Sequence, residues 1–202
     1  MNRWVMSGCA AVVAVMSAET FAQSPKSATY IAAEQVKAVN ASPGIDKQIV
    51  VVDVGKINEA IGVIHRGPAA GMLPGTGEPC GEKGPTPPTG QVISGITHDH
   101  QTETYIITSG GGTLVTGGRI VNGRKSAPDS EITKLLTGPS CSGALVGNDV
   151  IKKTVKAGDL IIIPAGVPHG WTDITDHVDY LNVRPDPDRV LPAGYVHPAI
   201  KR

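Results

Sequence analysis

Short runs of β-branched and apolar residues, separated by turn residues, make up most of the chain from residue 48 onward. Such runs are typical of strands, in which apolar residues recur at every second position or fill the whole run. Glycine and proline between the runs mark turns. The pattern predicts an all-β fold, either a sandwich or a barrel. The expected strands are 48–54, 61–65, 92–97, 104–108, 113–116, 119–121, 144–146, 160–163 and 180–183.

One segment, residues 27–41, has helical periodicity instead. Ile31, Val36 and Val39 approximate the spacing of one helix face. Ser27 or Thr29 can cap its start, and the Pro43-Gly44 pair ends it. We therefore expect one short N-terminal helix before the strands begin.

Two long stretches lack any periodic pattern. Residues 66–90 are rich in glycine and proline, and a loop of that length is often a functional lid. Residues 122–148 form a second polar excursion. The three glycines at 110–112 are not a phosphate-binding loop, because no helix and no Lys-Ser/Thr pair follows them. They predict a bend at the end of a strand.

The first 22 residues are typical of a cleavable secretory signal peptide. Arg3 supplies a positive charge, an apolar run extends over residues 9–16, and Thr20 and Ala22 place small residues before a cut. The apolar run is too short to span a bilayer as a helix. We expect a mature chain that starts near Gln23 and is exported to the periplasm or the cell exterior.

The charge is balanced, with 18 basic and 18 acidic residues. Removing residues 1–22 takes away only Arg3 and Glu19, so the mature chain stays neutral. A neutral chain has no electrostatic attraction for nucleic acid or an anionic membrane surface, and no later segment has the length and apolarity of a membrane span. We expect neither nucleic acid nor a membrane as a partner.

Two cysteines, Cys80 and Cys141, remain after the expected cleavage, and both lie in loops rich in glycine and proline. In an exported protein, an even pair of cysteines favours a disulfide. Two free thiols in loops are the alternative that the sequence leaves open.

Three histidines and one carboxylate lie on strand-like segments in two distant parts of the chain. Segment 90–110 contains His98, His100 and Glu103, and segment 158–169 ends at His169. His98 and His100 would share one face of a strand, because successive side chains point to opposite faces. Such a mixed nitrogen and oxygen set suits Fe(II), Mn(II), Ni(II), Cu(II) or Zn(II). The pattern predicts one divalent metal ion inside a barrel, and the alternative is a vestigial polar core.

These two segments resemble the two motifs of the cupin superfamily. The second motif is clear: Gly158, five residues, Pro164, one residue, Gly166, two residues and His169, with Asp173 where an asparagine is usual. The resemblance spans roughly residues 50–184 and implies a cupin-type double-stranded β-helix, or jelly-roll barrel. The expected organisation is then a signal peptide (1–22), an N-terminal helix and arm (23–47), the barrel (48–184) and a C-terminal tail (185–202).

The first motif fits in two registers. The family pattern is His-x-His, three or four residues, Glu, six residues and Gly, and Glu103 to Gly110 has the last spacing. If His98 and His100 are the pair, only two residues precede Glu103. If His98 is the second histidine, four residues precede Glu103 and Ile96 takes the first place. His98, Glu103 and His169 are ligands in both registers, whereas His100 is a ligand in one.

The resemblance implies a metalloenzyme of the oxygenase, isomerase or lyase type that acts on a small molecule. Tyr105 and Asp173 are the nearest residues expected to transfer protons. A non-catalytic barrel that binds a small ligand or a metal, and a barrel with a filled pocket, are the alternatives. A homodimer is an expectation from the resemblance alone.

Other polar and aromatic residues have plainer interpretations. Trp171 shares a strand face with His169, and it either lines a pocket or plugs the core. His65, Arg66 and His177 fit strand ends or loops without a role in chemistry. The tail that contains His197 is expected to pack on the barrel or on a neighbouring chain.

Overall fold

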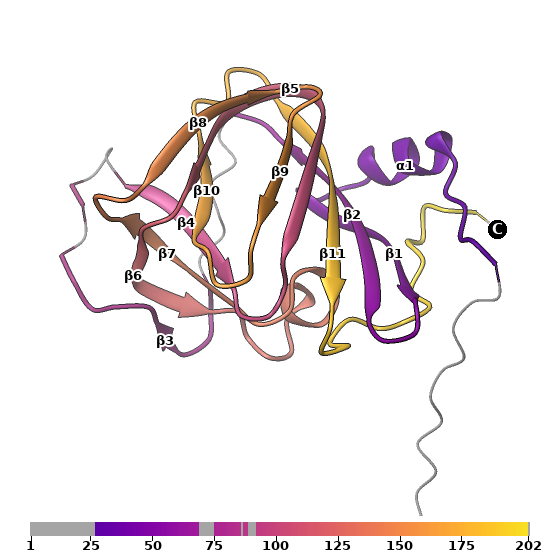
Figure 1. The fold of residues 1–202 in the computed structure, drawn as a ribbon, viewed down its shortest axis with the longest axis horizontal. Helices are drawn as coiled ribbons and strands as arrows, with labels where there is room; N and C mark the ends of the chain where they lie inside the picture. The colour runs from indigo at the N-terminus through magenta and orange to yellow at the C-terminus, as the bar shows by residue number, and fades with distance from the viewer. Residues whose placement is uncertain (1–26, 69–74, 86, 89–91, 202) are drawn as a thin grey trace, which may run out of the picture.

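The protein is an antiparallel β-structure with one short α-helix (Figure 1). This computed structural model describes residues 27–68, 75–85, 87–88 and 92–201. Within these ranges, no helix has the length and apolarity needed to cross a membrane. The elements are α1 Ala33–Asn40, β1 Asp46–Asp53, β2 Asn58–Arg66, β3 Pro79–Cys80, β4 Ile93–His98, β5 Glu103–Thr116, β6 Arg119–Lys125, the π-helical turn η1 Ile132–Leu136, β7 Ser140–Val146, β8 Ile151–Lys156, β9 Leu160–Ile163, β10 His169–Thr172 and β11 Val178–Asp186.

Strand β5 joins two groups of strands into one sheet of 11 strands, which curves around a shared interior (Figure 1). Its first half pairs with β9 and β11, and its second half pairs with β8 and β10. The strand order β1-β2-β11-β5-β10-β4-β7-β6-β3 places sequence-distant strands side by side. As a result, β4, β5 and β10, which come from both candidate motifs, are neighbours.

The interior contains one large apolar cluster and, beside it, a group of buried polar side chains. Inward-facing residues of several strands form a buried cluster that is packed against Trp171, namely Ile64, Tyr105, Ile107, Leu114, Val155, Ile163, Ile174, Val178 and Tyr180. Burying each large apolar side chain of this kind contributes about 1.5–3 kcal/mol to folding. The buried polar group contains Glu103 at the start of β5 and His169, which is paired with Thr116 at the end of β5.

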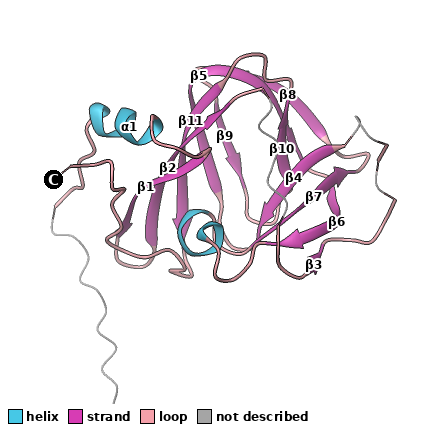
Figure 2. Ribbon diagram, turned by 180° about the vertical axis from the view of Figure 1, so that it is seen from behind, coloured by secondary structure: helices cyan, strands magenta, loops and turns pink. Residues whose placement is uncertain are grey.

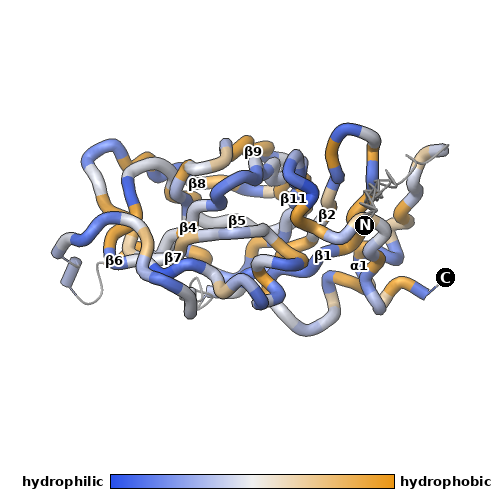
Figure 3. The backbone as a smooth tube through the Cα atoms, turned by 90° about the horizontal axis from the view of Figure 1, so that it is seen from below, coloured by the Kyte–Doolittle hydropathy of each residue, from blue (hydrophilic) through white to orange (hydrophobic). Residues whose placement is uncertain are grey.

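Helix α1 and the C-terminal tail cover the outer face and the free edge of β1 and β2. Val39 of α1 is buried against Ile49, Val50 and Val63, and the tail adds Val196 to this cluster. Figure 3 shows α1, β1 and the C-terminus at the same end of the molecule. The tail also hydrogen-bonds to the edge of β1, with the Gly194 amide donating to Val51 and the His197 amide donating to Ile49. The tail is thus an arm on its own barrel, which shields an edge strand that would otherwise expose unpaired backbone groups.

The structure corrects three details of the predicted elements. The helix begins at Ala33, not near residue 27, and its first turn is capped by Gln35, whose side chain accepts a hydrogen bond from the Ala32 amide. The glycines at 110–112 do not end a strand but lie inside β5. Gly110 has a positive φ of 65°, and a side chain at any of the three glycines would overlap neighbouring atoms. The glycines therefore allow β5 to pass from its first partners, β9 and β11, to its second partners, β8 and β10, without ending. From the sequence pattern alone, the same glycines predict the end of a strand. Strand β8 was also missed, because its exposed lysines obscure the apolar alternation.

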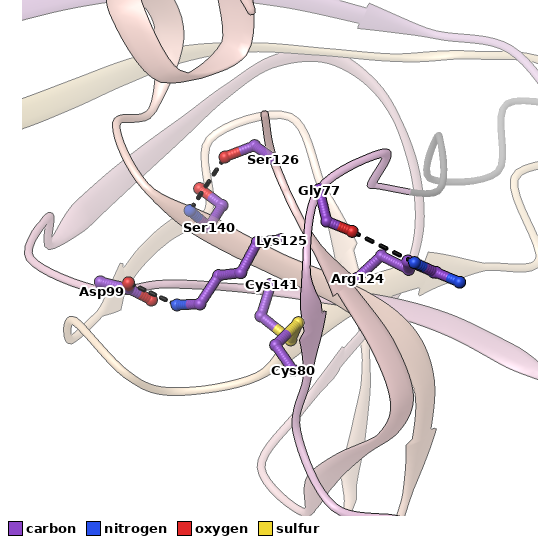
Figure 4. Close-up of a disulfide and its surroundings, with 8 residues drawn as sticks. All are labelled: Gly77, Cys80, Asp99, Arg124, Lys125, Ser126, Ser140 and Cys141. Atoms are coloured by element: carbon purple, nitrogen blue, oxygen red, sulfur yellow. Dashed lines mark hydrogen bonds and ion pairs between the residues drawn. A yellow bond between two sulfur atoms is a disulfide. The ribbon is translucent and has the colours of Figure 1, made fainter. Parts of the chain in front are cut away.

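Cys80 and Cys141 form a disulfide, as the sequence predicted (Figure 4). The bond attaches the short strand β3 to β7, and Ser140 of β7 lies next to it in the chain. The expected lid, residues 66–90, lies partly outside the described residues, and the expected signal peptide lies wholly outside them.

Candidate metal centre

Three buried side chains from three adjacent strands converge in the barrel interior. His98 ends β4, Glu103 begins β5 and His169 begins β10. The Glu103 Oε2 atom lies 3.2 Å from His98 Nε2 and 3.1 Å from His169 Nε2. All three residues are at most 4% exposed. Among the described residues, this is the group of His, Cys, Asp and Glu side chains that could hold a metal ion.

The two candidate motifs are joined by a backbone hydrogen bond at this group. The Gly166 amide donates to the carbonyl oxygen of His98 at 2.8 Å. Gly166 has a φ of 80° and open space around its α-carbon, so the turn requires glycine for its backbone conformation and not for room. This turn brings His169 into register opposite Ile96 of β4.

The position of Ile96 decides between the two registers of the first motif. Ile96 and His98 both line the cavity beside the three-residue group, so Ile96 occupies the place of the first histidine. His100 lies outside the group, in the turn after β4, where its exposed Nδ1 contacts the Asp188 carboxylate at 2.9 Å. The alternation that would have put His100 on the face of His98 ends with the strand, at His98 itself.

A double-stranded β-helix whose two motifs meet at one buried His/Glu/His group settles the fold. The chain has the cupin fold. In this cupin barrel, the interior group uses three side chains, because Ile96 replaces a fourth.

Structural comparison finds similar barrels at low sequence identity. They include a double-stranded β-helix protein from Klebsiella pneumoniae (16% identity over 80% of this chain and 93% of that one, TM-score 0.40). A protein from Bacillus halodurans has 12% identity over 87% of this chain and 93% of that one, with a TM-score of 0.42. An oxalate oxidase bound to the substrate analogue glycolate has 14% identity over 73% of this chain and 54% of that one, with a TM-score of 0.35. No family model matches the sequence of this chain, and no curated protein matches it at a significant level.

Both predicted proton-transfer residues can now be placed. The Tyr105 hydroxyl donates to Glu103 Oε2 at 2.8 Å, as its position near Glu103 suggested. Burial, together with the Glu103 charge, raises the pKa of Tyr105 well above its usual value, so the phenol stays protonated. Asp173 is exposed and follows the end of β10, with a φ of 53°. Its turn breaks the alternation that would have aimed it inward with His169, and its carboxylate accepts from Thr172 instead.

Two buried residues that the sequence pattern did not indicate contact Glu103 on the oxygen away from the histidines. The second carboxylate oxygen, Oε1, accepts hydrogen bonds from Asn182 at 2.5 Å and from Arg184 Nε at 2.9 Å. Arg184 is 1% exposed and also pairs with Asp46 through both terminal nitrogens. The sequence feature that could have indicated them is the alternation of side-chain direction along β11. It puts Asn182 and Arg184 on the same buried strand face as Tyr180. Polar residues at the strand positions that otherwise carry apolar, buried side chains indicate a buried hydrogen-bond network.

The electrostatics of the group favour a charged Glu103 and a neutral His98. Burial would raise the pKa of Glu103, but its interactions with His98 and Arg184 outweigh burial and lower that pKa well below its usual value. Burial lowers the pKa of His98, and this exceeds the opposite influence of Glu103. Arg184 remains charged, because Asp46 and Glu103 compensate for its burial and raise its pKa.

These shifts predict that the metal-free protein loses stability as pH falls. Both groups have lower pKa values folded than unfolded, so acid favours the unfolded chain, which takes up protons more readily. The loss should begin near the unfolded pKa of about 6.5 for His98 and deepen below about 4.5 for Glu103. Urea midpoints measured with chelator from about pH 7.5 down to about pH 4 would check this. Glu103→Gln should flatten the lower part of the curve, and a midpoint that rises on acidification would contradict the expectation.

Proposed function

We propose that His98, Glu103 and His169 bind one divalent metal ion, and that the protein is a metalloenzyme of the oxygenase, isomerase or lyase type acting on a small molecule. The observation that carries the proposal is the direction of the two histidine lone pairs, which the hydrogen bonds behind each ring determine. Fe, Mn, Ni, Cu and Zn all suit the donor set of two imidazoles and a carboxylate.

Each imidazole has its proton on the nitrogen that faces away from Glu103. His169 Nδ1 lies 3.1 Å from the carbonyl oxygen of Val167, which can only accept, so Nδ1 carries the proton. His98 Nδ1 lies 2.8 Å from the Ser140 hydroxyl, and that hydroxyl donates its own proton to the Gly138 carbonyl. In neutral imidazoles of this kind, the Nε2 atoms hold lone pairs. In this arrangement both lone pairs point at the Glu103 carboxylate, and a cation between the three atoms would stabilise them.

The spacing of these atoms fits a metal ion. With metal–ligand bonds of about 2.0–2.2 Å, neighbouring ligand atoms lie roughly 3 Å apart. The distances of 3.1 and 3.2 Å from Glu103 Oε2 to the two Nε2 atoms are in that range. Because Asn182 and Arg184 occupy Oε1, Glu103 would bind the ion through Oε2 alone.

Three protein ligands leave coordination positions for other molecules. A bound ion of this kind supplies Lewis-acid polarisation of a substrate oxygen, or a place where dioxygen can bind. The protein's own contribution is a cavity beside the group, whose lining includes the apolar surfaces of Ile96, Trp171 and Tyr180. Tyr105, whose hydroxyl donates to Glu103 Oε2, is the residue proposed to hold or return a proton there.

One observation favours the second candidate, a non-catalytic barrel that binds a metal and a small ligand. The Tyr105 hydroxyl is already committed to Glu103, and the Asp173 carboxylate lies on the surface. Under this alternative, the same ion binds the ligand without turning it over.

We also propose that the protein is exported. The disulfide between Cys80 and Cys141 supports it, because disulfides persist in the periplasm and outside the cell and are rare in the cytosol. N-terminal sequencing of the processed protein should give a start near Gln23, and a chain that still begins at Met1 after fractionation would contradict export.

Metal content tests the centre directly. We expect residues 23–202, purified without chelator, to contain about one equivalent of Fe, Mn, Ni, Cu or Zn by plasma mass spectrometry. The double variant His98→Ala/His169→Ala should lose the ion, because one carboxylate cannot hold it alone. His100→Ala is the matched control, since it removes an exposed histidine outside the group and should leave the content unchanged. A wild-type protein that contains no metal and takes up none of these ions would overturn the proposal.

A further inference from the structure

A cavity of about 370 Å³ opens beside the His/Glu/His group. Four apolar side chains of its lining are only partly buried and therefore keep surface that a ligand can contact, namely Ile45, Ile132, Leu136 and Trp171. Ile132 and Leu136 belong to η1, the second helical element in Figure 2. The cavity is at the lower end of the size range for small-molecule sites, so it suits a ligand of roughly 10–20 non-hydrogen atoms.

Two buried tyrosines hold the Trp171 indole in place. Tyr180 packs on Trp171 with ring centres 5.5 Å apart, and the Tyr105 ring lies 6.5 Å from Trp171 and is nearly parallel to it, at 12°. Both tyrosines are at most 4% exposed, so Trp171 is the ring of these three that keeps accessible surface. Aromatic pairs gain attraction beyond the area that they bury, so a fixed indole at the cavity favours an aromatic ligand.

The charged side chains inside the cavity are already engaged by other protein groups. Arg184 hydrogen-bonds to both Asp46 and Glu103. Arg66 donates through Nε to the Tyr180 hydroxyl at 3.1 Å. These contacts fix the arginines and carboxylates in the wall of the cavity.

The inner charges also balance, because the two arginines match the two carboxylates in number. Glu131 lines the cavity as well, but its side chain is exposed, so solvent screens its charge. A charged ligand would therefore lose its water without meeting, among the described residues of the lining, an excess of opposite charge inside the cavity. Burial of an unpaired charge costs far more free energy than burial of a neutral group.

We infer that the cavity binds an uncharged aromatic molecule, whose ring lies against Trp171 and contacts the aliphatic side chains of η1. The inference rests on the proposed function in one respect, because the cavity would hold the substrate of the metal centre. The driving force of binding is burial of apolar surface, which does not need the ion. The metal-free protein should therefore bind such a molecule too.

Three probes of one shape and different charge test this preference. Calorimetric titration of chelator-treated protein, residues 23–202, should show naphthamide binding at least about tenfold more tightly than naphthoate or naphthamidinium. Equal or tighter binding of either ion would overturn the inference. Because the ion is removed, this result does not depend on the metal centre, whose failure is detected separately by the metal content of untreated protein.

Tryptophan emission tests where the probe binds. The chain has two tryptophans, Trp4 and Trp171, so the emission of residues 23–202 comes from Trp171 alone. Bound naphthamide should quench this emission, with the same Kd as in calorimetry. Calorimetric binding without any change in emission would place the probe outside the cavity and contradict the inference.

Variants of the lining test the two walls. Trp171→Leu should weaken naphthamide binding about tenfold, and Trp171→Phe, which keeps a ring, should restore part of the affinity. Tyr30→Leu is the matched control, because it removes an aromatic ring that is 89% exposed and lies outside the cavity lining, and it should leave binding unchanged. Leu136→Lys adds a positive charge to the η1 wall and should shift the ratio of affinities toward naphthoate. Wild-type affinity in Trp171→Leu, or an unchanged ratio in Leu136→Lys, would overturn the placement of the ligand.

Discussion

Replacing Arg184 with methionine should lower the free energy of unfolding of the metal-free protein by about 3–5 kcal/mol. Arg184 is 1% exposed and joins Asp46 to Glu103. Without it, Glu103 keeps a buried negative charge whose counter-charge has gone, and Asn182 alone cannot compensate. Urea unfolding in the presence of chelator measures the change and excludes any contribution from bound metal.

Two further variants separate loss of a counter-charge from loss of packing. The double variant Glu103→Leu/Arg184→Met removes both charges, so it should be more stable than Arg184→Met alone, since apolar replacement of a buried pair is often neutral. Arg119→Met is the surface control: its partner Glu82 is 65% exposed, and the expected change is within about 1 kcal/mol. If Arg184→Met matched Arg119→Met, Arg184 would not be the residue that keeps Glu103 charged.

The second large effect concerns the disulfide. The double variant Cys80→Ser/Cys141→Ser should be less stable by roughly 2–5 kcal/mol. The bond closes a loop between positions 61 residues apart, for which loss of chain entropy in the unfolded state predicts about 4 kcal/mol. Denaturant midpoints of the wild type with and without reductant should reproduce the difference.

The disulfide also has a local effect that the same variant can reveal. Cys141 follows Ser140, whose hydroxyl accepts a hydrogen bond from His98 Nδ1. The Ser140 amide in turn donates to the Ser126 hydroxyl (Figure 4). In the Cys80→Ser/Cys141→Ser variant, the free energy of metal binding should therefore change less than the free energy of unfolding. The reason is that strand β7 still pairs with β4 at His98. A labelable thiol in the untreated wild type, or a midpoint that reductant does not move, would be inconsistent with the disulfide.

The sequence was sufficient for the fold and for the core of the site, because those depend on local pattern. Short β-branched runs predicted most strands, and the spacing from Gly158 to His169 predicted a turn that needs glycine at 166. His98, Glu103 and His169 followed from the resemblance to the two cupin motifs, and the structure brings them together. Each motif is a run of residues within about a dozen positions of one another, whereas the meeting of the two motifs depends on strand pairing.

What could not be predicted depends on contacts between distant segments. Arg184 is 81 residues from Glu103 and 138 from Asp46, so no local pattern links them. Whether His100 joins the group depended on where β4 ends, and element ends are the least certain part of any sequence pattern. Asp173 was misplaced for the same reason, at the end of β10.

The passage of β5 between two sets of partners restricts where this chain can change length during evolution. A residue inserted between Glu103 and Gly110 would turn every following side chain to the opposite face and shift the glycines away from the crossing. The pairings with β9 and β11 and those with β8 and β10 would lose register together. Insertions and deletions should therefore accumulate in the loops before β4 and after β6, and relatives of this protein should keep the distance from Glu103 to Gly110 even where little else of the sequence is retained.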